Sequence, residues 1–173
     1  MKKIVLITGC SSGIGAALAL EFHRRGHTVL ATARRPAALA PLAEKGIRTL
    51  AIDVNDDASI AAAAAVIESE GGQIDVLINN AGFSQVGAVI DLSRDDLRRQ
   101  YETNVIAPVA VTRAFLPLLR AAATRNGTAV VANVGSIVGL FATPFAGAYC
   151  SSKAAIHSSV SYTHLTLPTN REV

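Results

Sequence analysis

The chain has 173 residues with a formal net charge of +3, and 50% of its residues are hydrophobic and 17% charged. This length is enough for one buried core, and the composition excludes a disordered chain. The two cysteines form no CxxC pair, the four histidines lack metal-site spacing and the basic residues form no run, which disfavours a disulfide framework, a metal site and nucleic-acid binding.

Short apolar segments alternate with helical ones from the start of the chain. Residues 3–8 are rich in β-branched residues and predict a strand; the apolar stretch is too short for a secretion signal, and no apolar run reaches the length of a membrane span. Residues 13–26 have apolar side chains at helical spacing and a glycine at the end. The other elements expected in the first half are a strand at 28–33, a short helix at 36–46 bent by Pro41, a strand at 48–53 and a helix at 56–72.

The second half of the chain continues this alternation. Its expected elements are a strand at 74–82, helices at 94–104 and 108–125, a turn at Asn126-Gly127, a strand at 128–136, and a helix that starts near Gly147 and ends near Ser159. Continuous apolar strands that alternate with helices indicate a parallel sheet covered on both faces. The predicted fold class is therefore α/β, a doubly wound parallel sheet of the Rossmann type.

A glycine-rich segment, TGCSSGIG at residues 8–15, joins the first strand to the first helix. Glycines at this junction allow a tight turn and a close approach of a pyrophosphate, to which the helix N-terminus offers N–H groups. A glycine pattern alone also fits an ordinary tight turn, but its place in the first βαβ unit favours nucleotide binding. The segment lacks the GK[ST] ending of a P-loop, which disfavours an ATPase or GTPase.

Four motifs follow one another along the chain: TGCSSGIG at 8–15, DV at 53–54, NNAG at 79–82, and a serine, Ser136, followed by the YxxxK pair Tyr149 and Lys153. With these motifs the chain resembles the short-chain dehydrogenase/reductase family, in its compact single-domain form, over residue 3 to about residue 159. Asn104 lies at a suitable place on the intervening helix. The cofactor-binding residues that the resemblance implies are Thr8, Gly9, Ser11, Ser12, Gly13, Ile14, Gly15, Arg34, Arg35, Asp53, Val54, Asn80, Ala81, Gly82, Tyr149 and Lys153.

The end of the second predicted strand indicates which cofactor binds. Family members that prefer NAD carry an acidic residue there, whereas this chain has Ala33 followed by Arg34 and Arg35. No carboxylate repels a 2′-phosphate at this place, and two guanidinium groups can bind it. Loop arginines often only face solvent, yet the missing acid and the added bases together favour NADP(H) over NAD.

The ends of two further strands are expected to contact the cofactor. The resemblance implies that Asp53 accepts a hydrogen bond from the adenine amino group. Asn79 and Asn80 are expected to stabilise the sheet, while Ala81 and Gly82 are small enough to let the cofactor ribose approach.

Tyr149 and Lys153 are four residues apart on the last predicted helix, so their side chains lie on one face. A free phenol has a pKa of about 10, and a nearby cation lowers it toward the range in which the hydroxyl can donate and accept a proton. We therefore expect Lys153 to activate Tyr149, and Ser136 to hydrogen-bond the same substrate oxygen. The resemblance also assigns to Lys153 the nicotinamide ribose hydroxyls, and to Asn104 a water that connects Lys153 to solvent.

Each of these residues also has an ordinary structural interpretation. A YxxxK pair is usually a helix surface, and Ser136 or Asn104 alone fits a cap or turn. Their joint occurrence at the carboxyl edge of a doubly wound sheet favours catalysis. The predicted reaction is reversible hydride transfer between NADP(H) and a small-molecule carbonyl/alcohol substrate. A non-catalytic NADP(H)-binding redox sensor is the alternative, which the intact catalytic set disfavours, and the loop spacing and short chain disfavour a sugar-nucleotide epimerase.

Several residues near this set are assigned no chemistry. Cys150 lies beside Tyr149, but no histidine is evidently paired with it, and it is interpreted as a small packing residue. Leu140, Phe141 and Phe145 fit either an apolar substrate cleft or an ordinary core. The two unpaired cysteines favour a reducing, cytoplasmic location.

The end of the chain departs from the helical pattern. Residues 160–169, VSYTHLTLPT, resemble a translated transposase adapter used in preparing sequencing libraries. This predicts a truncated dinucleotide-binding domain at residues 1–159 and a non-native tail at 160–173. The family resemblance implies a sixth strand beside the fifth, so we expect an incomplete sheet edge, a poorly soluble and poorly active chain, and an active, homo-oligomeric full-length parent.

Overall fold

A computed structural model describes residues 2–163, with side-chain surroundings for residues 2–159. The predicted tail at 160–173 lies outside the residues whose side chains are described and stays a prediction. The chain forms two compact units. The first, here the sheet unit, comprises residues 1–82 and 106–134, and the second, here the helical unit, comprises residues 83–105 and the chain from Gly135 onward.

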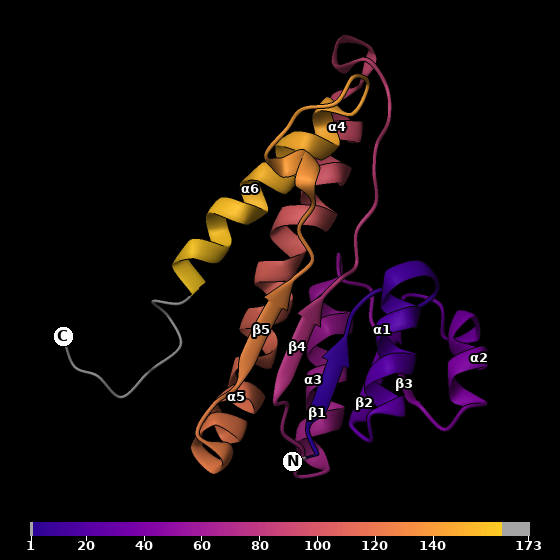
Figure 1. Ribbon diagram of the computed structural model, residues 1–173, viewed down its shortest axis with the longest axis vertical. Helices are drawn as coiled ribbons and strands as arrows, with labels where there is room; N and C mark the ends of the chain where they lie inside the picture. The colour runs from indigo at the N-terminus through magenta and orange to yellow at the C-terminus, as the bar shows by residue number, and fades with distance from the viewer. Residues whose placement is uncertain (1, 164–173) are drawn as a thin grey trace, which may run out of the picture. The chain divides into compact units, whose positions relative to one another are not determined.

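The sheet unit contains five parallel strands (Figure 1). In chain order they are β1 (Ile4–Ile7), β2 (Thr28–Ala33), β3 (Arg48–Ala51), β4 (Val76–Asn79) and β5 (Val130–Asn133). Their order in the sheet is β3-β2-β1-β4-β5, and Leu6 of β1 lies opposite Leu30 of β2 and Leu77 of β4. The order reverses between β1 and β4, which is the place where doubly wound sheets bind ligands. The predicted fold class is confirmed.

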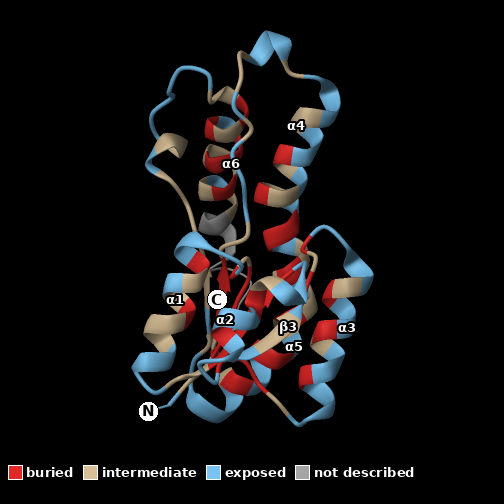
Figure 2. Ribbon diagram, turned by 90° about the vertical axis from the view of Figure 1, so that its right-hand side faces the viewer, coloured by how far each residue is buried: buried red, intermediate tan, exposed pale blue. Residues whose placement is uncertain are grey.

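Helices cover both faces of this sheet because alternate residues of each strand point to opposite faces. The helices of the sheet unit are α1 (Gly13–Arg24), α2 (Ala40–Ala43) after the 3₁₀ turn η1 (Pro36–Leu39), α3 (Asp57–Ser69) and α5 (Ala107–Asn126). Leu6 belongs to a core cluster with residues of α3 and α5, whereas Val5 and Ile7 belong to a second cluster with residues of α1 and α2. In Figure 2 the buried residues of α3 lie along one side of that helix.

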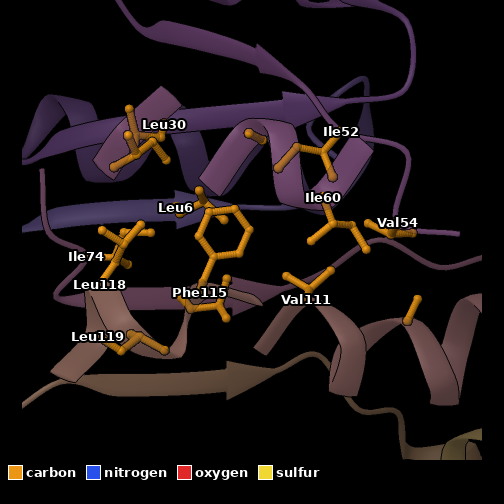
Figure 3. Close-up of a cluster of buried hydrophobic side chains, with 14 residues drawn as sticks. Leu6, Leu30, Ile52, Val54, Ile60, Ile74, Val111, Phe115, Leu118 and Leu119 are labelled. Atoms are coloured by element: carbon orange, nitrogen blue, oxygen red, sulfur yellow. The ribbon is translucent and has the colours of Figure 1, made fainter. Parts of the chain in front are cut away.

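The larger cluster is centred on Phe115 of α5, whose ring is fully buried beside Leu6 (Figure 3). Burying a phenylalanine side chain contributes roughly 1.5–3 kcal/mol to folding. Helix α5 is also part of a stretch that bears on the expectation of no membrane span. Among the described residues, the continuous helical stretch Arg94–Asn126 is long and apolar enough to cross a membrane by length and composition, although we expected no such segment. Phe115, Leu118 and Leu119 of this stretch pack in the core of the sheet unit.

The buried carboxylate of Asp75 links β1 to the C-terminal end of α5. Asp75 Oδ2 accepts the Ile4 N–H at 2.7 Å, and Asp75 Oδ1 accepts from Asn126 Nδ2 at 2.6 Å. Asn126 ends α5, and Gly127 follows it with φ +80°, a left-handed conformation that favours glycine. The predicted Asn126-Gly127 turn is confirmed.

The helical unit consists of α4 (Arg94–Tyr101), the π-helical turn η3 (Glu102–Ile106) up to Val105, and α6 (Gly147–Thr163), with 3₁₀ turns at η2 (Val89–Asp91) and η4 (Ile137–Gly139). Ser93 begins α4 with a capping box, since its hydroxyl accepts from the Asp96 N–H and the Asp96 carboxylate accepts from the Ser93 N–H. The expected end of the last helix near Ser159 was wrong, because α6 continues to Thr163. Serine, tyrosine and threonine lower helix propensity only slightly, so nothing local stops the helix there.

Candidate active site

The glycine-rich turn of the sheet unit packs too closely for a side chain at two of its glycines. Gly9 has φ +73°, and a Cβ added to it would lie 2.7 Å from the Ala81 Cα. A Cβ on Gly15 would lie 2.5 Å from Asn80 Nδ2 and closer still to the Gly9 carbonyl oxygen. Gly13 differs, because its φ is +57° but nothing lies within 4 Å of an added Cβ. Two of the predicted glycines are thus required by close packing, and the third by backbone conformation.

Two polar side chains hold this turn against the end of β4. The Thr8 hydroxyl oxygen accepts the backbone N–H groups of Asn80 and Ala81, both at 3.0 Å. In return, Asn80 Nδ2 donates to the carbonyls of Thr8 and Gly9 at 2.9 and 3.1 Å. Hydrogen bonds therefore connect the turn to the NNAG segment at the place where the strand order reverses. Gly82, which ends that segment, is exposed.

The N-terminus of α1 points out of this turn with its polar groups available. Ser11, Ser12, Gly13 and Ile14 are all exposed. Ser12 is the N-cap residue, yet within the described part of the chain its hydroxyl makes no capping hydrogen bond. The first turn of α1 has no acidic residue. A helix N-terminus with free N–H groups and no carboxylate suits a phosphate.

The first NNAG asparagine has the structural role expected for it. Asn79 Nδ2 donates to Asn133 Oδ1 of β5 at 2.9 Å and to Thr112 Oγ1 of α5 at 3.1 Å. The expectation that Asn79 and Asn80 stabilise the sheet is confirmed, and a cofactor role for Asn80 stays a prediction.

The residues predicted to select the cofactor follow the ends of β2 and β3. Arg34 and Arg35 are exposed directly after the buried Ala33. Asp53 is half-buried; its carboxylate accepts the Asn55 N–H and its own N–H donates to Ser59 Oγ, both at 3.0 Å. Val54 is buried in the larger core cluster. The structure therefore leaves both guanidinium groups accessible to a phosphate and fixes the turn that carries Asp53.

In the helical unit, Asn104 lies in the π-helical turn and is buried. Its Oδ1 accepts the Phe83 N–H at 3.2 Å, and its Nδ2 donates to the Phe83 carbonyl at 3.0 Å and to Ser152 Oγ at 3.1 Å. Both amide hydrogens are thus engaged, so a water at this side chain would have to donate to Oδ1.

Gln100 repeats this arrangement one helical turn earlier, and no motif in the sequence predicts it. Its side chain is fully buried, Nε2 donates to the Phe83 carbonyl at 2.9 Å, and Oε1 accepts the Gln85 N–H at 2.7 Å. In the sequence, Gln100 and Asn104 are marked only by their spacing of four. That spacing does not predict these hydrogen bonds, because they depend on segment 83–85 lying beside the helix.

Tyr149 and Lys153 lie on one face of α6, as their spacing predicts. Lys153 Nζ is 5.8 Å from the centroid of the Tyr149 ring. Lys153 is only 7% exposed, and this burial lowers the pKa of its ammonium group. A lysine held in this way presents a desolvated positive charge next to a phenol.

Ser136 belongs to the same unit and is held at two points. Its hydroxyl oxygen accepts the Val138 N–H at 3.4 Å as the N-cap of η4, and its backbone N–H donates to His157 Nε2 at 3.3 Å. The hydroxyl hydrogen therefore remains for a further acceptor. No motif in the sequence predicts this contact of His157.

The cysteines and the apolar loop residues also have clear positions. Cys10 is buried in the smaller core cluster, and burial raises the pKa of its thiol to about 11. Cys150 is buried as well, 3.6 Å from Thr143 Oγ1. Three large apolar side chains in the loop between η4 and α6 are exposed and are not part of a core; they are Leu140, Phe141 and Phe145.

The chain is similar in sequence to many proteins of one family. The model of the short chain dehydrogenase family matches residues 3–170. One curated relative, the short-chain dehydrogenase cctT of Talaromyces islandicus, is 39% identical over an alignment that covers 90% of this chain and 54% of its own length. Another, the NADPH-dependent 1-acyldihydroxyacetone phosphate reductase of Schizosaccharomyces pombe, is 39% identical over 90% of this chain and 51% of its own length. The chain thus spans about half the length of the curated relatives it matches.

Solved structures agree with this similarity. A short-chain dehydrogenase from Streptomyces avermitilis superposes with a TM-score of 0.86 at 36% identity, over 94% of this chain and 59% of that chain. NADPH-bound carbonyl reductase from chicken fatty liver superposes with a TM-score of 0.84 at 31% identity, over 94% of this chain and 75% of that chain.

Proposed function

The chain belongs to the short-chain dehydrogenase family of oxidoreductases, and we propose on this basis that it transfers a hydride between NADP(H) and a carbonyl/alcohol substrate. The observation that supports this most directly is the Tyr149–Lys153 pair, a phenol with a buried ammonium group 5.8 Å from its ring on one helix face. Burial of the lysine charge costs free energy, and a positive charge held next to a phenol can stabilise the phenolate.

The proton chemistry follows from these side chains. When bound, the nicotinamide cofactor donates the hydride to the carbonyl carbon or accepts it from the alcohol. In the reductive direction the Tyr149 hydroxyl gives its proton to the carbonyl oxygen, and the positive charge of Lys153 stabilises the phenolate that remains. In the oxidative direction the phenolate takes the proton back.

Ser136 assists at the same oxygen. Its hydroxyl oxygen already accepts the Val138 N–H, so its own hydrogen is the one to donate to the substrate. A hydrogen bond that strengthens as negative charge develops on the oxygen lowers the barrier. Asn104, which ties Phe83 to Ser152 of α6, keeps the tyrosine-bearing helix in register, and its Oδ1 accepts from the proposed water.

The glycine turn fits the cofactor. We propose that its N–H groups and the uncapped Ser12 hydroxyl bind the pyrophosphate, and that Arg34 and Arg35 bind a 2′-phosphate. Their exposure after a strand end without a carboxylate supports NADP(H) over NAD. Two similar proteins point the same way, since one is named as NADPH-dependent and the other binds NADPH.

We further propose a cytoplasmic location and a homo-oligomeric full-length parent. We also propose a substrate with an apolar part. The exposed Leu140, Phe141 and Phe145 lie between Ser136 and Tyr149 in the chain, so they are close in sequence to both residues that bind the substrate oxygen. The yeast relative acts on an acyl-bearing ketone by its name.

A single-turnover experiment tests the proposed function. The chain in excess over NADPH is mixed with a panel of ketones, aldehydes and quinones, and oxidation of the bound cofactor is followed by fluorescence, in parallel with Tyr149→Phe. We expect slow oxidation in the unsubstituted chain and a rate at least about a hundredfold lower in the variant, the usual contribution of one general acid. Tight NADPH binding without oxidation in either protein would instead support the redox-sensor alternative.

A further inference from the structure

His157 contacts the turn that carries Ser136. Its Nε2 accepts the Ser136 backbone N–H at 3.3 Å. In α6, His157 comes one turn after Lys153 and two turns after Tyr149, so the three side chains follow one another along one helix face. The imidazole thus joins the face that bears the proposed catalytic pair to the residue proposed to bind the substrate oxygen.

The packing of α6 and of the His157 ring against the Ser136 turn accounts for two glycines outside the proposed cofactor site. A Cβ added to Gly135 would overlap the His157 Nε2 atom. One added to Gly139 would lie 2.8 Å from His157 Cε1, 2.9 Å from its Nδ1 and 2.8 Å from the backbone carbonyl carbon of Lys153. All three distances for Gly139 are shorter than real side chains allow. Glycines on both sides of Ser136 therefore let the imidazole, and at Gly139 also the α6 backbone, approach the turn this closely.

This hydrogen bond determines which ring nitrogen of a neutral His157 carries the hydrogen. A nitrogen that accepts an N–H carries no hydrogen, so the proton of the neutral imidazole is on Nδ1. With its backbone N–H bound to His157 and its hydroxyl oxygen bound to the Val138 N–H, Ser136 is fixed at both ends. The two bonds set the position of its hydroxyl oxygen, and the hydroxyl hydrogen is left to donate to a substrate oxygen.

We propose that His157 is a positioning residue for the reaction: as a neutral Nδ1–H tautomer it holds the Ser136 backbone, and through it the position of the Ser136 hydroxyl oxygen. This role rests on the proposed function, because it matters only if Ser136 binds a substrate oxygen. His157 itself contacts neither substrate nor cofactor in this scheme. Loss of the acceptor should therefore slow the chemical step and leave NADPH binding unchanged.

The kinetic test uses two substitutions and a matched control. His157→Leu keeps apolar volume but removes the acceptor, and His157→Gln places an amide oxygen near the former Nε2. We expect His157→Leu to lower the single-turnover rate by about tenfold, the size of one lost hydrogen bond, with NADPH affinity within about twofold of wild type. His157→Gln should recover most of the rate, to within about threefold of wild type. The control is His27→Leu, because His27 Nδ1 also accepts a backbone N–H, that of Lys3 at 3.2 Å, but lies in the sheet unit; its rate should match wild type.

A structural measurement separates this inference from the proposed function. The ¹⁵N resonances of the His157 ring report which nitrogen carries the proton, and amide hydrogen exchange reports the Ser136 N–H. A protonated Nδ1 and a Ser136 amide that loses protection in His157→Leu but keeps it in His157→Gln support the contact. A proton on Nε2, or equal rates in His157→Leu and wild type, overturns the proposal. No turnover in any protein, with the Nδ1 tautomer present, refutes the proposed function and the catalytic role of His157 with it, while the contact itself stands.

Discussion

Gly15→Ala is expected to separate cofactor binding from stability. Gly15 is the third residue of α1 and has no positive φ, so alanine alone would favour the helix by about 1 kcal/mol. Its Cβ, however, would lie 2.5 Å from Asn80 Nδ2 and closer still to the Gly9 carbonyl oxygen, so the turn must move by about 1 Å to restore normal contact. That movement breaks the two hydrogen bonds from Asn80 to Thr8 and Gly9, which contribute about 2 kcal/mol together.

The net loss of stability is therefore only about 1 kcal/mol, a fall in Tm of about 3 °C for a domain of this size. The loss of NADPH affinity should be on the order of a hundredfold, because a shift of about 1 Å misplaces every N–H that faces the pyrophosphate. Thermal unfolding by circular dichroism and an NADPH fluorescence titration measure the two effects. Gly26→Ala is the control: Gly26 has φ +82° and open space, so alanine there costs roughly 1–2 kcal/mol of strain and leaves affinity unchanged. Wild-type NADPH affinity in Gly15→Ala would refute the assignment of this turn to the cofactor.

Two further substitutions test the buried charges. Lys153→Met should abolish turnover, because the variant has no positive charge to stabilise the Tyr149 phenolate; turnover at the wild-type rate would contradict this. Because burial lowers the pKa of Lys153, the unfolded chain binds more protons between the lowered and the ordinary pKa, so wild-type stability to urea should rise with pH across that interval and the variant should lack this rise. Asp75→Asn should cost about 1–3 kcal/mol in urea unfolding, because an amide nitrogen then faces the N–H of Ile4 or the amide of Asn126, with NADPH affinity retained; an unchanged free energy of unfolding would show that the carboxylate contributes nothing.

The elements that the sequence predicted well are those whose signal is local. The period of apolar residues and the turn glycines located the strands and α1, α3 and α5, because each signal lies within one element. The short helix at 36–46 was less regular than expected: Pro36–Leu39 is a 3₁₀ turn, and α2 is a single turn with Pro41 near its start. Proline lacks the N–H that a longer helix would need. The two faces of the sheet follow from the alternation along β1, where Leu6 and its neighbours Val5 and Ile7 enter different cores.

The contacts that the sequence did not predict join segments far apart in the chain. Nothing in the sequence marks residues 102–106 as π-helical, and the bonds from Gln100 and Asn104 to Phe83 depend on segment 83–85 running beside the helix. The edge of the sheet was inferred from family resemblance and not from pattern. Among the described residues β5 pairs with β4 alone, and Val130 is 41% exposed, which fits an unpaired edge.

Lys153 and His157 differ in how far along the chain their contacts reach. Both lie on the Tyr149 face of α6, but the role of Lys153 follows from a spacing of four within one helix, whereas the contact of His157 with Ser136 spans 21 residues. The sequence does hold an indirect trace of that contact, because Gly135 and Gly139 flank Ser136. Glycines on both sides of a turn indicate that some group packs too closely for a Cβ. They do not identify the group; the imidazole is identified only once α6 is placed against the turn, and from that contact the tautomer of His157 and the position of the Ser136 hydroxyl oxygen follow.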